Sequence, residues 1–419
     1  MKIVIISKSD TTGGAAIAAK RLKDALQANG HNVNMLVQEK ESNDPTIYTT
    51  GDSSLKKKWN FVLFVIERLY FLFFEKSKAI RFAFSPAIAG EDISSHTLVK
   101  QADIIHIHWF NQGYLSLNGL KKLIKLNKPI VWTLHDMWAF TGGCHYSGDC
   151  ENYKFACGNC KFLKHPGSRD LSTKIYKKKV KTLKGSNIQF VTCSNWLSDK
   201  AKQSSMLQGF NIQSIPNPID TITFSPKEKT VVRHNLGLPL DKKLILFGSA
   251  NIADERKGLK YLIEALKKLD QDEHFSKNDL EIVMFGKSNE ELLSQISYKI
   301  SNLGIVKGEN SIADVYCAAD VFVLPSIEDN LPNTIMESLA CGTPVVAFNI
   351  GGIPEMIDHK INGYLAEFKS VDDLVNGIQY VLDADSEKLK KASLQKVEEC
   401  YANKMVSMKY YSCYQSVTK

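Results

Sequence analysis

The sequence lacks a membrane-crossing segment and a secretion signal. Its first residues, MKIVIISKSD, contain neither a long apolar stretch nor a small-residue cleavage site, so we expect no signal peptide. In the most apolar segment, residues 56–82, the apolar core from Trp59 to Phe74 is interrupted by Asn60, Glu67 and Arg68 and is too short to span a bilayer. We therefore expect a cytoplasmic protein.

Two common nucleotide-binding motifs are absent as well. Gly13 and Gly14 follow an apolar segment, but they do not form G-x-G-x-x-G, which leaves dinucleotide binding unsupported. Gly286 and Lys287 resemble the end of a P-loop, yet Ile282 stands where that motif requires glycine. No acidic residue lies in a recognisable motif for a covalent nucleophile.

Cysteine is unevenly distributed. Four of the nine cysteines lie between residues 144 and 160, with the spacing C-x5-C-x6-C-x2-C. Without a secretion signal, clustered cysteines favour a metal over disulfides, and four thiolates satisfy tetrahedral zinc. The sequence shows no set of three ligands that would leave one coordination position of the zinc open, so catalytic zinc is not expected. We predict a structural zinc site, with disulfides or free thiols as alternatives; its residues are Cys144, Cys150, Cys157 and Cys160, with His145 and His165 as spare ligands.

The length of 419 residues predicts two domains. Apolar segments typical of buried strands alternate with amphipathic helical segments in both halves. We therefore predict an α/β fold with two doubly wound parallel-sheet domains that face each other across a cleft, the default ligand site. The domains are placed at residues 1–214 and 215–395, with a C-terminal helix in residues 396–419 that crosses back to the first domain. The hinge is placed at residues 214–220, which contain two prolines.

Individual elements follow from the same patterns. Strands are expected at residues 2–6, 33–37, 102–109, 129–136, 188–194, 243–250, 281–286, 319–326 and 344–349. The main helices are expected after Gly13 and at residues 117–126, 258–269, 289–300 and 334–339.

Residues 56–82 do not fit a simple α/β domain. The segment is rich in aromatic residues and holds seven basic and two acidic side chains. These features are typical of a helix that lies in a membrane surface. With the formal charge of +8 and further lysine-rich stretches in the same half, they predict a peripheral position on the anionic inner face of the cytoplasmic membrane. The alternative is a buried core helix with basic ends.

Two acids lie eight positions apart in the stretch LPSIEDNLPNTIMESLACGTPVV. Asp329 lies in the loop that ends a predicted strand, and Glu337 lies about one turn into the next helix, with Asn333 as the predicted N-cap. Both carboxylates should point at the ligand, near exposed N–H groups of Asn330, Leu331 and Asn333. This arrangement suits a polyhydroxyl ligand joined to a diphosphate. A surface acid and a capping acid are the alternative.

Glycines and cations supply candidate phosphate contacts. Gly13 and Gly14 open a helix, where backbone N–H groups and the helix dipole favour an anion. Arg256 and Lys257 begin a helix in the second domain, where cations oppose the dipole, so we interpret them as partners of a bound anion. The alternative for Gly13 and Gly14 is a plain strand-to-helix turn. The alternative for Arg256 and Lys257 is that both side chains are solvated.

Several motifs occur in an order that resembles the retaining GT-B glycosyltransferases of family four, also called glycosyl transferases group one. They are the N-terminal GG, IPNPID, RKG and PSIEDNLPNTIMESLACGTPVVAFNIGGIPEMI. The acid-x7-acid spacing is the hallmark of that family. The stretches IIHIHWFNQGYLSL and VWTLHDMWAFTGGCHYSGDC resemble a bacterial subgroup that builds colanic acid, O-antigen or exopolysaccharide. The resemblance covers nearly the whole chain.

The resemblance implies roles for single residues. Glu337 would bind the nucleotide ribose, and Lys257 would neutralise the diphosphate. Asp329 would contact the donor sugar near its reacting carbon, although its side chain is shorter than the usual glutamate. His135 would lie near the donor sugar, with His108 as the second candidate.

Other positions match the family less directly. Gly14 would face the phosphate or the acceptor. The usual arginine is replaced by Ile252, so Arg256 is the candidate substitute. The motifs GGIPE and NGYL match structural loops of the second domain and receive no chemical role.

As a whole, the resemblance implies a retaining transferase that moves a sugar from a nucleoside diphosphate to a saccharide or polyprenyl-linked acceptor. The first domain would bind the acceptor and the second the donor. It implies no catalytic metal, provided that Lys257, Arg256 and backbone donors neutralise the diphosphate. Two alternatives stay open: a GT-B nucleotide-sugar epimerase, and a non-catalytic scaffold or nucleic-acid binder. The set of Asp329, Glu337 and Lys257 argues for nucleotide-sugar binding, so no nucleic-acid partner is expected.

Overall fold

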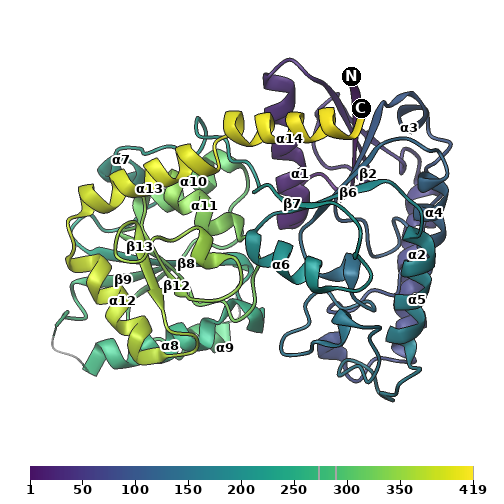
Figure 1. Ribbon diagram of the computed structural model, residues 1–419. Coiled ribbons are helices and arrows are strands. Elements are labelled where there is room, and N and C mark those ends of the chain that lie inside the picture. Colours follow the sequence, from purple (N-terminus) through teal and green to yellow (C-terminus); the bar gives the residue numbers. More distant parts are fainter. Residues whose placement is uncertain (272–273, 288–289, 419) are drawn as a thin grey trace. The chain divides into compact units, whose positions relative to one another are not determined.

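Two parallel sheets organise the chain. The computed structural model describes residues 1–271, 274–287 and 290–418 (Figure 1). The chain divides into two units: the first contains Met1–Pro216 and the segment that begins at Val406, and the second contains Asn217–Met405. Each unit holds one sheet with helices packed against it, so the predicted fold class is confirmed.

The first unit contains a seven-stranded sheet in the order β3-β2-β1-β4-β5-β6-β7. All pairings are parallel. Its strands are β1 (Lys2–Ser9), β2 (Asn32–Glu39), β3 (Ile47–Thr49), β4 (Ile104–Ile107), β5 (Ile130–Leu134), β6 (Ile188–Thr192) and β7 (Ile212–Ser214). Its helices are α1 (Gly14–Ala28), α2 (Ser54–Leu72), α3 (Thr97–Gln101), α4 (Leu117–Ile124), α5 (Leu171–Leu183) and α6 (Asn195–Gln203), with 3-10 turns at Lys78–Ile80, Trp138–Phe140 and Asn152–Lys154.

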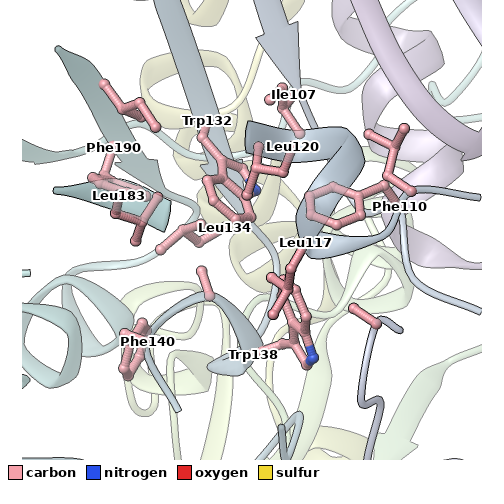
Figure 2. Close-up of a cluster of buried hydrophobic side chains, with 14 of the residues drawn as sticks. Ile107, Phe110, Leu117, Leu120, Trp132, Leu134, Trp138, Phe140, Leu183 and Phe190 are labelled. Atoms are coloured by element: carbon pink, nitrogen blue, oxygen red, sulfur yellow. The ribbon is translucent and has the colours of Figure 1, made fainter. Parts of the chain in front are cut away.

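The core of the first unit lies on both faces of this sheet. On one face, side chains of β4, β5 and β6 meet those of α4 and α5. Figure 2 shows Trp132 and Leu134 between Phe190 and the α4 residues Leu117 and Leu120. The other face packs α1 and the part of α14 (Asn403–Thr418) that follows Met405. Strands covered on both faces explain the near-continuous apolar segments in the sequence.

The second unit contains a six-stranded sheet in the order β10-β9-β8-β11-β12-β13, again parallel. Its strands are β8 (Lys243–Asn251), β9 (Leu280–Lys287), β10 (Ile300–Asn302), β11 (Val321–Leu324), β12 (Val345–Phe348) and β13 (Gly363–Ala366). Its helices are α7 (Lys229–Asn235), α8 (Leu259–Gln271), α9 (Glu290–Leu293), α10 (Glu309–Ala318), α11 (Asn333–Ala340), α12 (Val371–Asp383) and α13 (Ser386–Cys400), with 3-10 turns at Glu255–Lys257 and Ile353–Glu355.

In each sheet, the strand order shows where the chain changes the direction in which it adds strands. In the first unit the reversal lies between β1 and β4, and in the second it lies between β8 and β11. Loops that leave the carboxyl ends of such neighbouring strands diverge and form a crevice, where doubly wound folds bind ligands. The loops after β8 and β11 carry Lys257 and Asp329, two of the predicted site residues.

Two predicted elements of the second unit are wrong. The helix expected at residues 289–300 falls partly outside the described residues, and where it is described α9 ends at Leu293 and β10 begins at Ile300. Ile300 pairs with Ile282 of β9, because the sheet edge offers backbone partners that outweigh the weak helical pattern. The NGYL motif, expected to be a loop, overlaps β13, which pairs with β12.

The segment 56–82 forms α2 and the 3-10 turn that follows it. Within the part of the chain that the structure describes, no helix has both the length and the apolar character needed to cross a bilayer.

Candidate active site

The centre of the candidate site in the second unit is an ion pair between Lys257 and Asp329. The Lys257 Nζ atom donates to Asp329 Oδ2 at 2.6 Å, and the two side chains are 22% and 13% exposed. The pair joins the loop after β8 to the loop after β11 at the reversal point of the sheet. The predicted cation and the first predicted acid therefore lie together, and solvent still reaches both.

The backbone around Lys257 is fixed by a close approach to the neighbouring loop. Gly258 ends the 3-10 turn with φ +73°, and a Cβ atom there would lie 1.8 Å from the Pro325 carbonyl oxygen. The Ile327 N–H donates to the Arg256 carbonyl oxygen at 2.8 Å. Only glycine fits this junction, and the RKG motif therefore positions the lysine for a structural reason.

The Asp329 side chain is held from two sides. The Ser326 hydroxyl donates to Asp329 Oδ2 at 3.2 Å. Gly351, with φ +62°, lies so close that a Cβ atom would be 1.9 Å from the Asp329 carbonyl oxygen. No role in the site was expected for the GGIPE motif, but its first glycine supports the loop that carries the acid. The sequence signal for this support is the pair Gly351-Gly352, which follows a predicted strand.

Arg256 forms an ion pair with Asp254. Its guanidinium donates to both carboxylate oxygens of Asp254, at 2.7 and 3.2 Å, and its side chain is 50% exposed. Burial alone would raise the pKa of Asp254, but the hydrogen bonds and charge of Arg256 hold that pKa below its ordinary value. Asp254 was not predicted, although an acid two positions before an arginine in a tight turn can reach it.

The second predicted acid, Glu337, lies on α11 and is 6% exposed. Its Oε2 atom accepts a hydrogen bond from the Tyr316 hydroxyl at 3.1 Å. Tyr316 comes from α10, so two helices orient the carboxylate. A buried carboxylate held in this way is preorganised to accept hydrogen bonds from a ligand.

The start of α11 differs from the prediction. Pro332 is the N-cap residue and Asn333 is already helical, with its Oδ1 atom accepting a hydrogen bond from Asn217 Nδ2 at 3.2 Å. The prediction of Asn333 as N-cap is therefore wrong, because proline with φ −66° already provides the extended conformation that precedes a helix. Asn330 and Leu331 are buried, at 3% and 6% exposure.

In the first unit, Gly13 and Gly14 form the junction between β1 and α1, as predicted. Gly13 is the N-cap residue with φ +92°, and its carbonyl oxygen accepts from the N–H groups of Ala16 and Ile17. A Cβ atom at Gly13 would meet nothing within 4 Å. The glycine is thus needed for its backbone conformation.

Three histidines form a chain at the ends of β4 and β5, of which His106 and His108 are buried and His135 is half-buried. His106 contacts the hydroxyls of Tyr414 and Thr133, each at 2.8 Å. His108 Nδ1 lies 2.9 Å from His135 Nε2, and His135 Nδ1 lies 3.4 Å from the Cys193 sulfur. The two histidines offered as alternatives for one role therefore contact each other.

Burial keeps these histidines neutral. It lowers the pKa of His106 to about 3, with a contribution from His135, and lowers the pKa of His135 to about 4 although Asp136 opposes the shift. The pKa of His108 is also well below its ordinary value, through burial and its histidine neighbours. At neutral pH, His135 therefore acts as a hydrogen-bonding group without charge.

Asp136 is a candidate residue that the sequence analysis missed. Its carboxylate accepts from His145 Nδ1 at 2.7 Å, from Trp109 Nε1 at 3.1 Å and from the Trp138 N–H at 2.8 Å. Burial alone would raise the pKa of Asp136, but His145 and these hydrogen bonds hold it below its ordinary value. The sequence signal for Asp136 is the pair His135-Asp136 at the end of a predicted strand. A small cavity includes His108, Asn111, His135 and Asp136 in its lining.

The cysteine cluster lies elsewhere in the first unit. Its four cysteines line a second small cavity and form no disulfide, and the Gly142 N–H donates to Cys157 Sγ at 3.1 Å. Across the described ranges, no three His, Cys, Asp or Glu side chains are grouped so that they could hold a metal ion. His145, a predicted spare ligand, instead binds Asp136 and the Ser85 hydroxyl. Structural zinc stays a prediction.

Two family models match the chain. One, described as Glycosyltransferase Family 4, matches residues 12–222, and the other, described as Glycosyl transferases group 1, matches residues 228–396. The first match alone covers just over half of the residues. The chain belongs to glycosyltransferase family 4. The family predicted from the motifs is thereby confirmed.

Curated relatives of this glycosyltransferase are distant. It is 27% identical to an uncharacterised glycosyltransferase of Methanocaldococcus jannaschii, over 88% of this chain and 85% of the relative. It is also 27% identical to the UDP-Gal:alpha-D-GlcNAc-diphosphoundecaprenol alpha-1,3-galactosyltransferase of Escherichia coli, over 41% of this chain and 45% of the relative. For several D-inositol 3-phosphate glycosyltransferases, the match spans 38% to 62% of the relative's length.

Solved structures show the same fold as this glycosyltransferase. The sucrose-phosphate synthase of Thermosynechococcus elongatus superposes with a TM-score of 0.68 at 18% identity, covering 100% of this chain and 99% of the other. HepE of Anabaena in complex with UDP superposes with a TM-score of 0.65 at 14% identity, covering 99% and 100%. The likeness confirms the predicted GT-B type of fold.

Proposed function

We propose that this glycosyltransferase moves a sugar from a nucleoside-diphosphate sugar to a saccharide or lipid-linked saccharide, with retention of anomeric configuration, in the synthesis of a bacterial surface polysaccharide. The observation that carries the proposal is the Lys257–Asp329 ion pair at the sheet reversal, with Glu337 on the helix that follows. A cation beside two oriented acids suits a ligand that combines phosphates with hydroxyls.

The donor's diphosphate is proposed to bind the ammonium group of Lys257. In the absence of a ligand, Asp329 compensates that charge at 2.6 Å. An arriving diphosphate competes for the ammonium, and Asp329 can then accept a hydrogen bond from a sugar hydroxyl. Glu337 is proposed to accept from the ribose hydroxyls, while Tyr316 holds it from behind.

Catalysis is then mainly electrostatic. As the bond from the sugar to the diphosphate breaks, negative charge builds on the leaving phosphate oxygens, and a fixed ammonium stabilises that charge more in the transition state than in the ground state. We propose that Lys257 and backbone N–H groups supply this stabilisation, so that no divalent ion is required. His135, neutral at pH 7, is the candidate donor or acceptor for a sugar hydroxyl.

The names of relatives support the substrate class. The Escherichia coli relative is named for UDP-galactose and a diphosphoundecaprenol acceptor, and a Bacillus subtilis relative is named a putative teichuronic acid biosynthesis glycosyltransferase. HepE was solved with UDP and with UDP-glucose. We propose a UDP-sugar as the first donor to test, with GDP-sugars as the alternative.

The test is a thermal-shift panel of UDP- and GDP-sugars, followed by hydrolysis and transfer assays with any sugar that raises the melting temperature. We expect one sugar nucleotide to stabilise the wild type and to be hydrolysed slowly without an acceptor. Glu337→Gln should weaken its binding about 10-fold to 150-fold, from the loss of one charge-assisted hydrogen bond. Tyr316→Phe, which removes only the supporting hydroxyl, should weaken binding less.

Three outcomes would contradict the proposal. If no sugar nucleotide binds, the chain is not a transferase of this class. If the sugar changes configuration without an acceptor, the epimerase alternative holds. If Glu337→Gln binds the donor as tightly as the wild type, the assignment of the ribose contact is wrong.

A further inference from the structure

The helix α2 buries polar side chains and exposes apolar ones. Among its residues facing the rest of the first unit are Asn60, Glu67 and Arg68, at 8%, 0% and 8% exposure. The opposite face carries large apolar side chains exposed from 41% to 79%: Leu55, Trp59, Phe61, Val62, Ile66, Leu69 and Leu72, with Phe73 directly after the helix at 77%. Leu63 and Phe71 are buried as well, but an ordinary surface helix does not also expose a row of large apolar side chains. The predicted alternative, a buried core helix, is therefore wrong.

The exposed apolar residues form one continuous stripe. Leu55, Trp59, Val62, Ile66, Leu69 and Phe73 follow each other at alternating intervals of four and three. Residues with this spacing lie above one another on one side of a helix. We call these six residues the α2 stripe. It runs along the whole of α2, and Phe61 and Leu72 widen it.

The orientation of α2 is fixed by the contacts of its buried side. The Arg68 guanidinium lies 3.3 Å from Glu67 Oε1 and donates to the Arg81 carbonyl oxygen at 2.6 Å. At Gly113 a Cβ atom would lie 2.6 Å from the Phe64 backbone nitrogen, so the loop after β4 packs directly on the helix. Rotating α2 to hide the stripe would break this packing and expose the polar cluster. The stripe is thus a stable feature of the surface.

Basic side chains lie at both ends of the stripe. Lys56, Lys57 and Lys58 are exposed at its start, and Lys76 and Lys78 are exposed beyond its end. Of the nearby acids, Glu67 and Glu75 are buried, and Glu75 binds Arg81 at 2.6 Å. The exposed Asp52 pairs with Lys56 at 3.1 Å. The surface therefore combines an apolar centre with positive ends.

We propose that α2 docks this glycosyltransferase flat on an anionic lipid bilayer, with the α2 stripe in the interface and the flanking lysines at the headgroups. The chemistry fits because an amphipathic helix binds through its buried apolar area and through attraction of its cations to anionic lipid. Trp59 and the phenylalanines suit the headgroup level, where aromatic rings gather.

A second copy of the chain fits this surface less well. A twofold dimer formed through the stripe would bring Lys56–Lys58 against the same residues of the partner if the helices ran parallel. If the helices ran antiparallel, those lysines would meet Lys76 and Lys78. Since both ends are basic, either arrangement places like charges together. An anionic bilayer satisfies both ends at once.

The experiment is vesicle co-sedimentation of the full chain, with vesicles of phosphatidylcholine alone and of phosphatidylcholine with one third phosphatidylglycerol. The wild type should bind the anionic vesicles, release from them at high salt and bind the neutral ones weakly. The double variant Trp59→Ser with Leu69→Ser should lose at least about tenfold in binding. Each of Lys57→Gln and Lys58→Gln should lose about fivefold, the equivalent of about 1 kcal/mol per lysine.

The matched control is Ile222→Ser, which replaces an apolar side chain 87% exposed in the second unit and should bind vesicles as the wild type does. The proposal is overturned if the wild type does not bind anionic vesicles, or if the double variant binds them unchanged. A dimer in solution that the double variant abolishes would also overturn it in favour of a second copy. Vesicle binding is measured without any sugar nucleotide, so its failure and the failure of the proposed activity are distinguishable.

Discussion

The ammonium group of Lys257 lies 2.6 Å from the carboxylate of Asp329, although 72 positions separate the two residues in the sequence. The contact arises because β8 and β11 are neighbours at the point where the strand order reverses, and the loops after them pack against each other. The charges are balanced before a ligand arrives. In the proposed donor complex, the diphosphate would replace the carboxylate at Lys257 and keep that charge compensated.

Replacing Lys257 by alanine should lower turnover at least about a hundredfold. The reason is that removing one group that stabilises developing charge costs about 3–4 kcal/mol in comparable sites. The measurement is kcat with the sugar nucleotide found in the binding panel. Lys257→Arg should retain part of the activity, and Lys260→Ala, which removes an exposed lysine on α8, should retain nearly all of it. A near-normal rate for Lys257→Ala would reject the assignment.

Replacing Gly258 by alanine should destabilise the fold more than the same change at Gly237. Both glycines have a positive φ, +73° and +66°, which costs an alanine about 1–2 kcal/mol. A Cβ atom at Gly258 would also lie 1.8 Å from the Pro325 carbonyl oxygen, whereas one at Gly237 would meet nothing within 4 Å. Urea unfolding of the two variants measures the difference. Equal losses of unfolding free energy would show that the junction relaxes freely.

Much of this site could be predicted because it depends on strand order. Apolar segments mark the buried strands, and the polar residues after them, Lys257 and Asp329, follow from the motif. The partner of Arg256 was missed because Asp254 reaches it through a 3-10 turn, whereas a helix was expected to begin there. The support of Asp329 by Gly351 depends on two loops that meet only in the folded unit.

Other failures have a similar physical origin. The expected helix through Ile300 shows that a short apolar pattern fits a helix and an edge strand about equally, and the neighbouring β9 decides between them. For α2, the composition predicted an apolar segment with basic ends. It did not predict which side of the helix faces the solvent. The buried pair of Glu67 and Arg68 determines which side faces the core.

The buried histidines should make the fold sensitive to mild acid. In the folded chain the pKa is about 3 for His106 and about 4 for His135, against about 6.5 in an unfolded chain. Between these values the unfolded state binds more protons, so the unfolding free energy falls as the pH falls from about 6.5 to 4. Each histidine contributes a slope of up to about 1.4 kcal/mol per pH unit.

Urea unfolding of the wild type and of His106→Gln at a series of pH values checks this expectation. Glutamine can retain hydrogen bonds to Tyr414 and Thr133 but cannot gain a proton, so the variant should lose part of the slope. The exposed His165 provides the matched control, His165→Gln. Parallel curves for wild type and His106→Gln would contradict the proposed burial of a neutral imidazole.

The cysteine cluster should bind one zinc ion per chain if the sequence prediction is right. In the metal-free fold, burial raises the pKa of the Cys157 thiol to about 12 and that of Cys160 to about 11, so zinc must displace protons to bind and its affinity should fall as the pH falls. Metal analysis of protein purified without chelator measures the content. Cys157→Ser with Cys160→Ser should abolish it, whereas Cys400→Ser, in the second unit, should leave it unchanged. Wild-type protein without zinc, whose four thiols all alkylate once the chain is unfolded in urea without reductant, would show that the cluster is a set of free thiols.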